Sequence, residues 1–96
     1  MQKIPCVYIM ASQRYGTLYV GVTSNLVQRV WQHRSHLVEG FTDEHKVTRL
    51  VYYEVHGEMY EAICREKTIK NWKRSWKIEL IEKANPGWVD LYSAII

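Results

Sequence analysis

Two short β-prone runs near the N-terminus, separated by a turn segment, constrain the fold of this chain most. The first run, Cys6 to Met10, and the second, Thr17 to Val22, are rich in β-branched and aromatic residues, the types enriched in strands. Between them lies a polar stretch that ends at Gly16, a typical turn signal. The pattern predicts an antiparallel β-hairpin.

The length of the hairpin loop determines which side chains meet across the two strands. With a four-residue loop, Ala11 pairs with Gly16, and Tyr8 then lies directly opposite Tyr19. Side chains alternate between the faces of a sheet, so Gly21 shares the face of both tyrosines. Aromatic cross-strand pairs commonly do no more than stabilise a hairpin, so this placement alone does not make the tyrosines functional.

The middle of the chain predicts a helix and a third strand. Asn25 is a typical N-cap residue and Gln28 stands three positions later, so we expect a helix from Leu26 to Leu37. Gly40 marks a loop after this helix. The run from Leu50 to Tyr53 is apolar and aromatic, and it predicts the third strand.

The C-terminal half predicts helices. Residues Met59 to Trp72 predict a second helix, and Ser75 to Lys83 either continue it or form another. Asn85 and Pro86 predict a restart, with asparagine as N-cap and proline at the first position of a short final helix that carries Trp88. A hairpin, a helix, a strand and further helices predict an α+β fold, a small three-stranded antiparallel sheet flanked by helices.

Composition restricts the class of protein. The chain has 96 residues, which suits a single domain over residues 1–96, and 47% of them are hydrophobic, as in folded proteins. The net charge of +3 permits a nucleic-acid partner without requiring one. Cys6 and Cys64 belong to no CxxC pair and lie in apolar segments, so we expect two buried free thiols. The sequence contains no transmembrane segment or signal peptide, so we expect a cytoplasmic protein without a membrane partner.

Glu66 is the most informative single position. On a helical wheel it lies among Met59, Ala62 and Ile69, so it points toward the core rather than the solvent. Carboxylates are rarely buried unless they are paired or bind a metal. Two explanations therefore stay open, an ion pair with Lys70 one turn further on, or a metal ligand.

Arg29 and His33 share one edge of the predicted first helix because they are four residues apart. Arginine offers a planar, permanently charged fork suited to phosphate, and histidine moves protons near neutral pH. The alternative is that Arg29 is a solvated surface residue and His33 a hydrogen-bonded residue at the margin of the core.

A basic stretch runs from Arg65 to Lys77, with six basic residues against one acid and with Trp72 and Trp76 among them. A basic helix with interleaved aromatic side chains can follow a phosphate backbone. The candidate nucleic-acid-binding residues in this stretch are Lys70, Lys73 and Arg74. The alternative is a solvated helix face whose tryptophans pack inward.

Together these positions resemble the GIY-YIG nuclease superfamily, in particular small stand-alone members akin to the nuclease domain of the excinuclease C subunit. The family's first motif matches Cys6-Val7-Tyr8, and the second matches Tyr19-Val20-Gly21. Arg29 and His33 match the family's first helix, and Glu66 matches a glutamate on a later helix. The similarity covers nearly the whole chain. Cys6 replaces a glycine and Val20 an isoleucine, and neither change removes a polar group.

The resemblance implies a three-stranded antiparallel sheet and DNA strand cleavage with one divalent cation, Mg²⁺ or Mn²⁺. It implies that Glu66 binds the metal and that Arg29 stabilises the scissile phosphate. Tyr8 and Tyr19 would orient or deprotonate the attacking water, and His33 matches a histidine that assists in some members. A tyrosine has an ordinary pKa of about 10, so phenolate at pH 7 costs roughly 4 kcal/mol. Whether a tyrosine or His33 takes the proton stays open.

A late asparagine also recurs in the family, and Asn85 is its candidate here, although an N-cap role before Pro86 also explains this residue. We expect a DNA endonuclease that serves DNA repair or processing, and a protein partner or self-association could supply its targeting. The alternatives are a non-catalytic nucleic-acid-binding module that keeps the fold, and an interaction protein that uses its tryptophans. The presence of Tyr8, Tyr19, Arg29 and Glu66 together favours retained chemistry.

Overall fold

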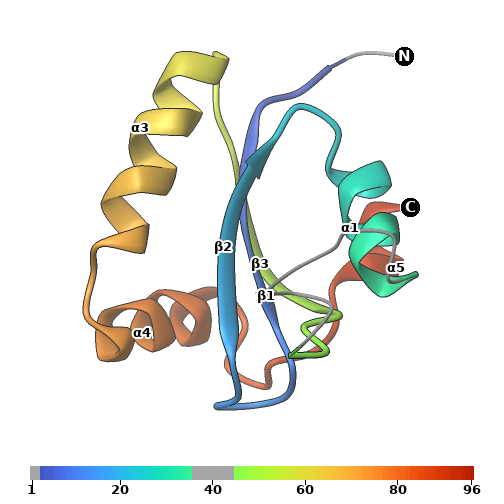
Figure 1. Cartoon of the computed structure of the whole chain (residues 1–96), viewed down its shortest axis with the longest axis vertical. Coiled ribbons are helices and arrows are strands. Elements are labelled where there is room, and N and C mark those ends of the chain that lie inside the picture. The colour runs from blue at the N-terminus through green and yellow to red at the C-terminus, as the bar shows by residue number, and fades with distance from the viewer. Residues whose placement is uncertain (1–2, 36–44) are drawn as a thin grey trace.

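Strand β1 is the centre of the fold. In the computed structural model, which describes residues 3–35 and 45–96, β1 (Cys6–Ala11) lies between β2 (Leu18–Thr23) and β3 (Arg49–Val55). Both pairings are antiparallel, and every residue of β1 is buried. The predicted three-stranded antiparallel sheet is confirmed (Figure 1).

Helices cover both faces of the sheet (Figure 1). Helices α3 (Met59–Lys70) and α4 (Arg74–Ala84) lie on one face, and α1 (Leu26–Arg34) and the short α5 (Tyr92–Ile95) lie on the other. The longest of these helices, α3, has 12 residues. Across the described ranges, no helix has the length and apolarity needed to cross a membrane.

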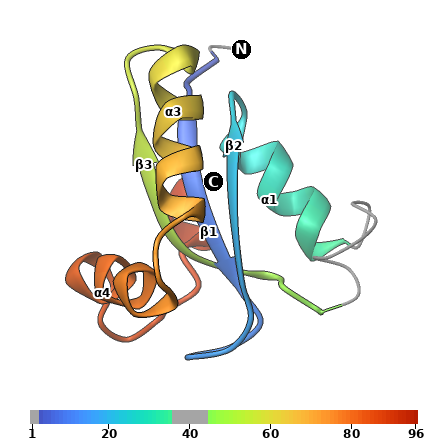
Figure 2. The ribbon, with the colours of Figure 1, turned by 60° about the vertical axis from the view of Figure 1, so that its left-hand side comes forward.

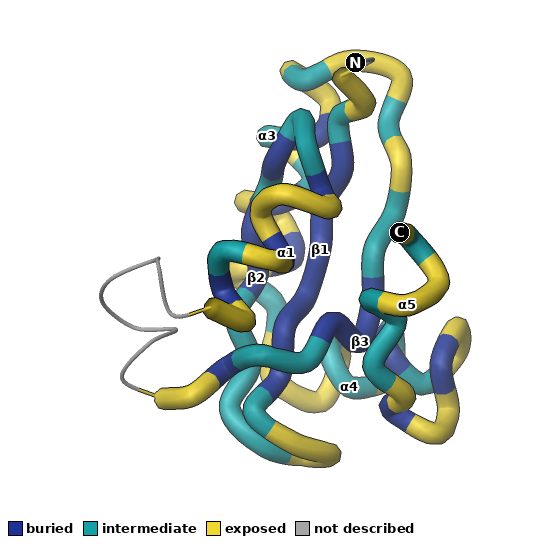
Figure 3. The backbone as a smooth tube through the Cα atoms, turned by 90° about the vertical axis from the view of Figure 1, so that its right-hand side faces the viewer, coloured by how far each residue is buried: buried dark blue, intermediate teal, exposed yellow. Residues whose placement is uncertain are grey.

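The alternation of side chains along β1 divides the core in two. Val7 and Ile9 pack beneath α3 and α4, together with the fully buried Trp88. Tyr8 and Met10 face α1 and α5 on the other side. Figure 3 shows β1 buried along its length, with exposed backbone mainly on the outer helices and turns. Because β1 supplies both cores, its sequence has no solvent-facing position.

The predicted hairpin register is wrong by two residues. Ala11 pairs with Leu18, and Tyr8 lies opposite Gly21 rather than Tyr19. A shift of two preserves the face of every side chain, so Tyr8 and Tyr19 still point to the same side of the sheet. They now meet diagonally instead of directly.

The cause of the shift is a turn of six residues, 12–17, instead of four. The turn is closed by the Ser12 amide, which donates to the Thr17 carbonyl at 3.0 Å, and by the Thr17 amide, which donates to Ser12 Oγ at 2.9 Å. Tyr15 adopts a left-handed φ of 60°, a conformation that tyrosine rarely takes. The register therefore depends on hydrogen bonds at Ser12 that residue propensities do not reveal.

Helix α1 begins at Leu26, where the sequence predicts. Asn25 Oδ1 accepts a hydrogen bond from the Gln28 amide at 3.2 Å, which confirms the N-cap. Asn25 Nδ2 in turn donates a hydrogen bond to Gln28 Oε1 at 3.2 Å. The helix ends at Arg34, and the expected end at Leu37 and the loop at Gly40 lie outside the described residues.

The second and third predicted helices are confirmed as two separate helices, α3 and α4. The predicted helix start at Asn85 is wrong. Asn85 is the C-cap of α4, and α5 starts only at Tyr92. The intervening Trp88 has a φ of 54°, which is incompatible with a right-handed helix.

The two cysteines differ in exposure. Cys6 is buried in β1 as predicted, whereas Cys64 on α3 is exposed, so its predicted burial is wrong. Ala62, Glu66 and Ile69 form the buried face of α3. Cys64 lies two positions from Ala62 and Glu66, which turns it to the outer side of the helix.

Gly21→Ala is expected to destabilise the fold because the Tyr8 ring lies against this glycine. A Cβ at position 21 would stand 2.5 Å from Tyr8 Cζ and Oη, and Tyr8 is too buried to move aside. We expect the free energy of unfolding to fall by about 1–3 kcal/mol, measured by urea denaturation. Gly57→Ala is the matched control, since a Cβ there meets nothing within 4 Å. Equal stability of the two variants would contradict the packing of Tyr8 on Gly21.

Candidate active site

Three rings gather on the α1 side of the sheet, and we call Tyr8, Tyr19 and His33 the aromatic cluster. The ring centroids of Tyr8 and Tyr19 are 6.3 Å apart. His33 lies 5.8 Å from Tyr8 and 5.4 Å from Tyr19. Tyr8 Oη and His33 Nε2 share a buried hydrogen bond of 3.0 Å. Gly21 leaves the space over β2 that the Tyr8 ring occupies.

The periodicity of α1 brings His33 into this cluster. Leu26, Val30 and His33 are the buried residues of the helix, at the spacing of one helical face. Leu26 and Val30 pack with Tyr8 in the core on this side of the sheet. His33 therefore lies on the buried face of α1. Burial removes the Tyr8 hydroxyl and His33 Nε2 from water, and the hydrogen bond between them replaces the lost bonds to water.

Burial determines the protonation of Tyr8 and His33. It is the largest cause that raises the pKa of Tyr8, and Tyr19 and Glu66 raise it further while Arg29 lowers it. Burial, assisted by the Arg29 guanidinium, lowers the pKa of His33 to about 4. At neutral pH the pair is therefore a phenol and a neutral imidazole. The positive charge of Arg29 does not offset the effect of burial on Tyr8.

Arg29 lies on the exposed side of α1, four residues before His33. Its charge acts on both Tyr8 and His33, so the guanidinium lies near the aromatic cluster while its side chain faces solvent. An exposed arginine beside a buried polar pair is placed to meet an anionic group that approaches from solvent.

Glu66 is buried on the apolar face of α3, as the helical wheel predicts, with 9% of its surface exposed. Its Oε2 accepts from Lys70 Nζ at 2.7 Å, so the ion pair that stayed open from the sequence is formed. The pair is not sealed, because the Lys70 side chain is 48% exposed. Lys70 Nζ also lies 5.9 Å from the centroid of the Tyr19 ring. Lys70 thus links Glu66 to the aromatic cluster.

The site forms along β2, which is an edge strand. Figure 2 shows β2 between α1 and α3. Tyr19 from β2 contacts His33 from α1 and Lys70 from α3. Tyr8, Tyr19 and His33 are therefore in direct contact, while Arg29 and Glu66 lie in the same region and act on Tyr8 through their charges.

Comparison with known proteins agrees with this arrangement. Residues 4–79 match the family described as the GIY-YIG catalytic domain. The chain belongs to the GIY-YIG family. Similar GIY-YIG-like proteins include a UPF0213 protein of Desulfotalea psychrophila, 32% identical over 78 residues, which cover 80% of this chain and 71% of that protein. A UPF0213 protein of Pediococcus pentosaceus is 33% identical over 67 residues, 70% of each chain.

A solved structure shares the fold. The solution NMR structure of a UPF0213 protein from Bacillus halodurans aligns with a TM-score of 0.57 and 24% identity, and the alignment covers 91% of this chain and 92% of that one. The resemblance of the sequence to the GIY-YIG nucleases is thus confirmed in both family and fold.

A metal ion would meet few protein ligands in this GIY-YIG protein. Within residues 3–35 and 45–96, no three histidine, cysteine, aspartate or glutamate residues group together to hold a metal. Glu66 is the carboxylate whose charge reaches Tyr8. Mg²⁺ keeps several waters and is commonly bound through one or two carboxylates plus phosphate of a substrate. The residues present fit a hard, oxygen-preferring cation that the substrate helps to hold.

The candidate nucleic-acid-binding residues have different surroundings. Lys70 is paired with Glu66, and Lys73 Nζ lies 5.2 Å from the centroid of the Trp76 ring. Arg74 Nη2 donates to the carbonyls of Tyr15 and Gly16 at 2.7 and 2.6 Å. Arg74 therefore fastens α4 to the hairpin turn, a contact that the sequence pattern did not reveal.

Asn85 has a structural function in this GIY-YIG protein. Its Nδ2 donates to the carbonyls of Val51 and Val89 at 3.0 and 2.8 Å, and its Oδ1 accepts from the Val89 amide at 3.1 Å. These bonds connect the end of α4 to β3 on the Trp88 side of the sheet. Both polar atoms of the Asn85 side chain are therefore hydrogen-bonded to the backbone, away from the aromatic cluster.

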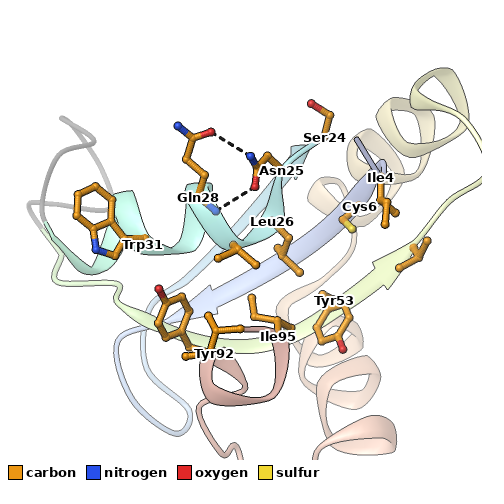
Figure 4. A pocket seen from close by; sticks show the side chains of 13 residues that line it. Ile4, Cys6, Ser24, Asn25, Leu26, Gln28, Trp31, Tyr53, Tyr92 and Ile95 are labelled. Carbon is orange, nitrogen blue, oxygen red and sulfur yellow. Dashed lines mark hydrogen bonds between the residues drawn. The ribbon is translucent and has the colours of Figure 1, made fainter. Parts of the chain in front are cut away.

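An apolar groove lies between α1, α5 and β3, apart from the aromatic cluster (Figure 4). Its volume is about 1010 Å³, and its apolar walls include Trp31, Tyr53 and Ile95. No side chain that lines it is acidic or basic, and Tyr8, Tyr19, Arg29, His33 and Glu66 are not among them. An uncharged apolar groove does not suit a phosphodiester, so we locate the site at the aromatic cluster.

Asn85→Ala is expected to lower the free energy of unfolding by about 2–3 kcal/mol, because buried carbonyls lose their donors. Urea denaturation measures this change. Asn71→Ala is the control, since Asn71 Nδ2 makes one exposed bond to the Lys67 carbonyl and its loss should cost less than about 1 kcal/mol. If Asn85→Ala instead keeps full stability and loses DNA cleavage, this side chain belongs to the reaction and not to the fold.

The stability of the protein should fall as His33 is forced to ionise. Its folded pKa of about 4 lies below the ordinary value of 6.5, so the unfolded chain binds the proton more readily between these values. We expect a loss of about 2 kcal/mol between pH 7 and pH 5 from this residue, measured as the difference between wild type and His33→Gln in urea denaturation. Parallel pH dependence of the two proteins would show that His33 ionises freely in the fold.

Proposed function

We propose that this protein is an endonuclease that hydrolyses DNA phosphodiester bonds with a divalent cation, in DNA repair or processing. The observation that carries the proposal is the buried hydrogen bond between Tyr8 and His33 at 3.0 Å, with Tyr19 beside it and the charges of Arg29 and Glu66 acting on it. A fold alone would not require a phenol, an imidazole, a guanidinium and a carboxylate to converge. An imidazole or a phenol can act as general acid or base, and a guanidinium can stabilise the charge of a transferring phosphoryl group.

Arg29 is proposed to bind the scissile phosphate. Its side chain is exposed on α1, and its charge already reaches Tyr8 and His33. A guanidinium donates two parallel hydrogen bonds to phosphate oxygens and stabilises the charge that develops as the bond breaks. The phosphate would then lie beside the Tyr8 hydroxyl.

Tyr8 and His33 are proposed to act on the attacking water as a pair. The raised pKa of Tyr8 makes a preformed phenolate unfavourable. With His33 protonated on Nδ1, the Tyr8 hydroxyl can donate to His33 Nε2 while its oxygen accepts a hydrogen bond from water. As the water attacks phosphorus, the bond from phosphorus to the leaving sugar oxygen breaks. The proton of the water passes to Tyr8, the Tyr8 proton passes to His33, and the leaving oxygen takes up a proton from solvent. A bound phosphate favours the resulting imidazolium by opposite charge, and Tyr19 helps to orient the water.

Glu66 would hold a divalent cation, Mg²⁺ or Mn²⁺. When bound, such a cation supplies charge neutralisation at the phosphate. The Glu66 carboxylate becomes available once Lys70 moves away, and the half-exposed Lys70 side chain can do so without disturbing the core. The released ammonium would then be free to contact a neighbouring phosphate.

A second function is favoured by the same ion pair. Lys70 neutralises Glu66 at 2.7 Å. If this ion pair persists when nucleic acid binds, the protein would bind nucleic acid through basic residues such as Lys73 without cleaving it. The two functions differ in one measurable property, the dependence of strand cleavage on the Glu66 carboxylate.

Glu66→Gln should abolish cleavage while it preserves the fold. Glutamine keeps the size of the side chain and an oxygen that accepts from Lys70, but it removes the charge that binds a divalent cation. We expect the single-turnover rate to fall by about 10²–10³-fold or more, measured with Mg²⁺ or Mn²⁺ on nicked, branched, flapped and plain DNA. Glu61→Gln is the matched control, an exposed acid on the same helix. Wild-type rates in Glu66→Gln would exclude the metal assignment, and no cleavage by any variant or the wild type would favour the non-catalytic module.

A further inference from the structure

Trp72 and Trp76 form a hollow that the proposed reaction does not use. Their rings meet edge to face, with centroids 6.2 Å apart and an angle of 82° between the planes. The hollow has a volume of about 340 Å³, and Leu80 completes its apolar walls. Glu79 and Lys83 lie at its rim. We call this feature the tryptophan hollow.

The tryptophan hollow is open and positively flanked. Trp76 is 48% exposed, although burial of an indole strongly favours folding. Lys73 Nζ lies 5.2 Å from the centroid of the Trp76 ring, and Arg65 Cζ lies 5.2 Å from that of Trp72. Arg65 is also paired with Glu54 at 3.0 Å, and Glu79 lines the hollow together with Lys83. Lys73 and Lys83 therefore supply the positive charge that attracts an anionic ligand. Aromatic faces bordered by basic groups are the composition that binds single-stranded nucleic acid.

The tryptophan hollow lies close to the proposed active site along the chain. Lys70 contacts both Glu66 and Tyr19, and Trp72 follows only two residues later. Two residues span at most about 7 Å of backbone. The backbone of the hollow therefore begins next to the residue that contacts both Glu66 and Tyr19.

We propose that the tryptophan hollow binds an unpaired base of the nucleic acid that is cleaved, so that the substrate is one with a single-stranded segment, such as a flap or a free end. This inference rests on the proposed function and specifies its substrate class. In a duplex both faces of a base are covered by its neighbours, whereas an unpaired base offers its face to an indole. Stacking tolerates any base sequence, which suits a small protein that reads structure rather than sequence.

The experiment measures binding without cleavage. Fluorescence anisotropy with a dye-labelled ten-nucleotide thymidine strand, and with a duplex of equal length, is performed in EDTA on the full chain. We expect Trp76→Ala to weaken binding of the single strand about tenfold and binding of the duplex less than twofold. Trp76→Phe should keep most of the affinity, because it keeps an aromatic face. Trp31→Ala is the matched control, since Trp31 is 49% exposed but lies on α1, and it should change neither affinity.

Several results would overturn the inference. Equal losses for strand and duplex would show that position 76 contributes only to general attraction, and an unchanged single-strand affinity would exclude stacking. An equal effect of Trp31→Ala would show that any exposed indole suffices. Failure of the proposed nuclease function gives a different result. Selective binding of the single strand without cleavage in Mg²⁺ would contradict the proposed reaction but would support base binding at the tryptophan hollow.

Discussion

Strand β1 is buried on both faces, and this burial determines the surroundings of Tyr8. A strand with neighbours on both edges and helices on both sides has no solvent-facing position, so Tyr8 must place its hydroxyl in the core. A buried hydroxyl needs a partner, and His33 supplies it from α1. The same burial raises the pKa of Tyr8 and lowers that of His33. The chemistry of the pair thus follows from where the sheet places it.

The two halves of the candidate site differ in rigidity. Tyr8, Gly21 and His33 lie within the packed core, so their geometry is set by folding. Glu66 and Arg29 approach from helices on either side of the edge strand, and Lys70 at the rim is half exposed. In the proposed reaction, a rigid pair of Tyr8 and His33 beside more exposed charges would allow a phosphate and a cation to enter without unfolding the sheet.

Local patterns predicted much of this molecule. Strand and helix positions followed from periodicity and caps, and the wheel position of Glu66 identified a buried acid that required explanation. The hairpin register did not follow, because Ser12 closes a turn longer than expected. The sequence predicts a helix start at Asn85, whereas Asn85 caps the end of α4, because the same side chain can cap either end of a helix. Contacts between distant segments, such as Lys70 with Tyr19, leave no periodic signal. The roles within the site came from the family resemblance, not from spacing.

Trp88 has a consequence for where the folding unit ends. This residue is fully buried beneath α4 in a left-handed conformation, and its indole donates to Glu82 at 2.9 Å. Ile81 fills the same core. The family match covers residues 4–79, so a fragment cut at that limit would keep every proposed active-site side chain and yet expose the face of the sheet that supports them. The recognisable motif is therefore shorter than the piece of chain that can be moved into another protein as a working unit.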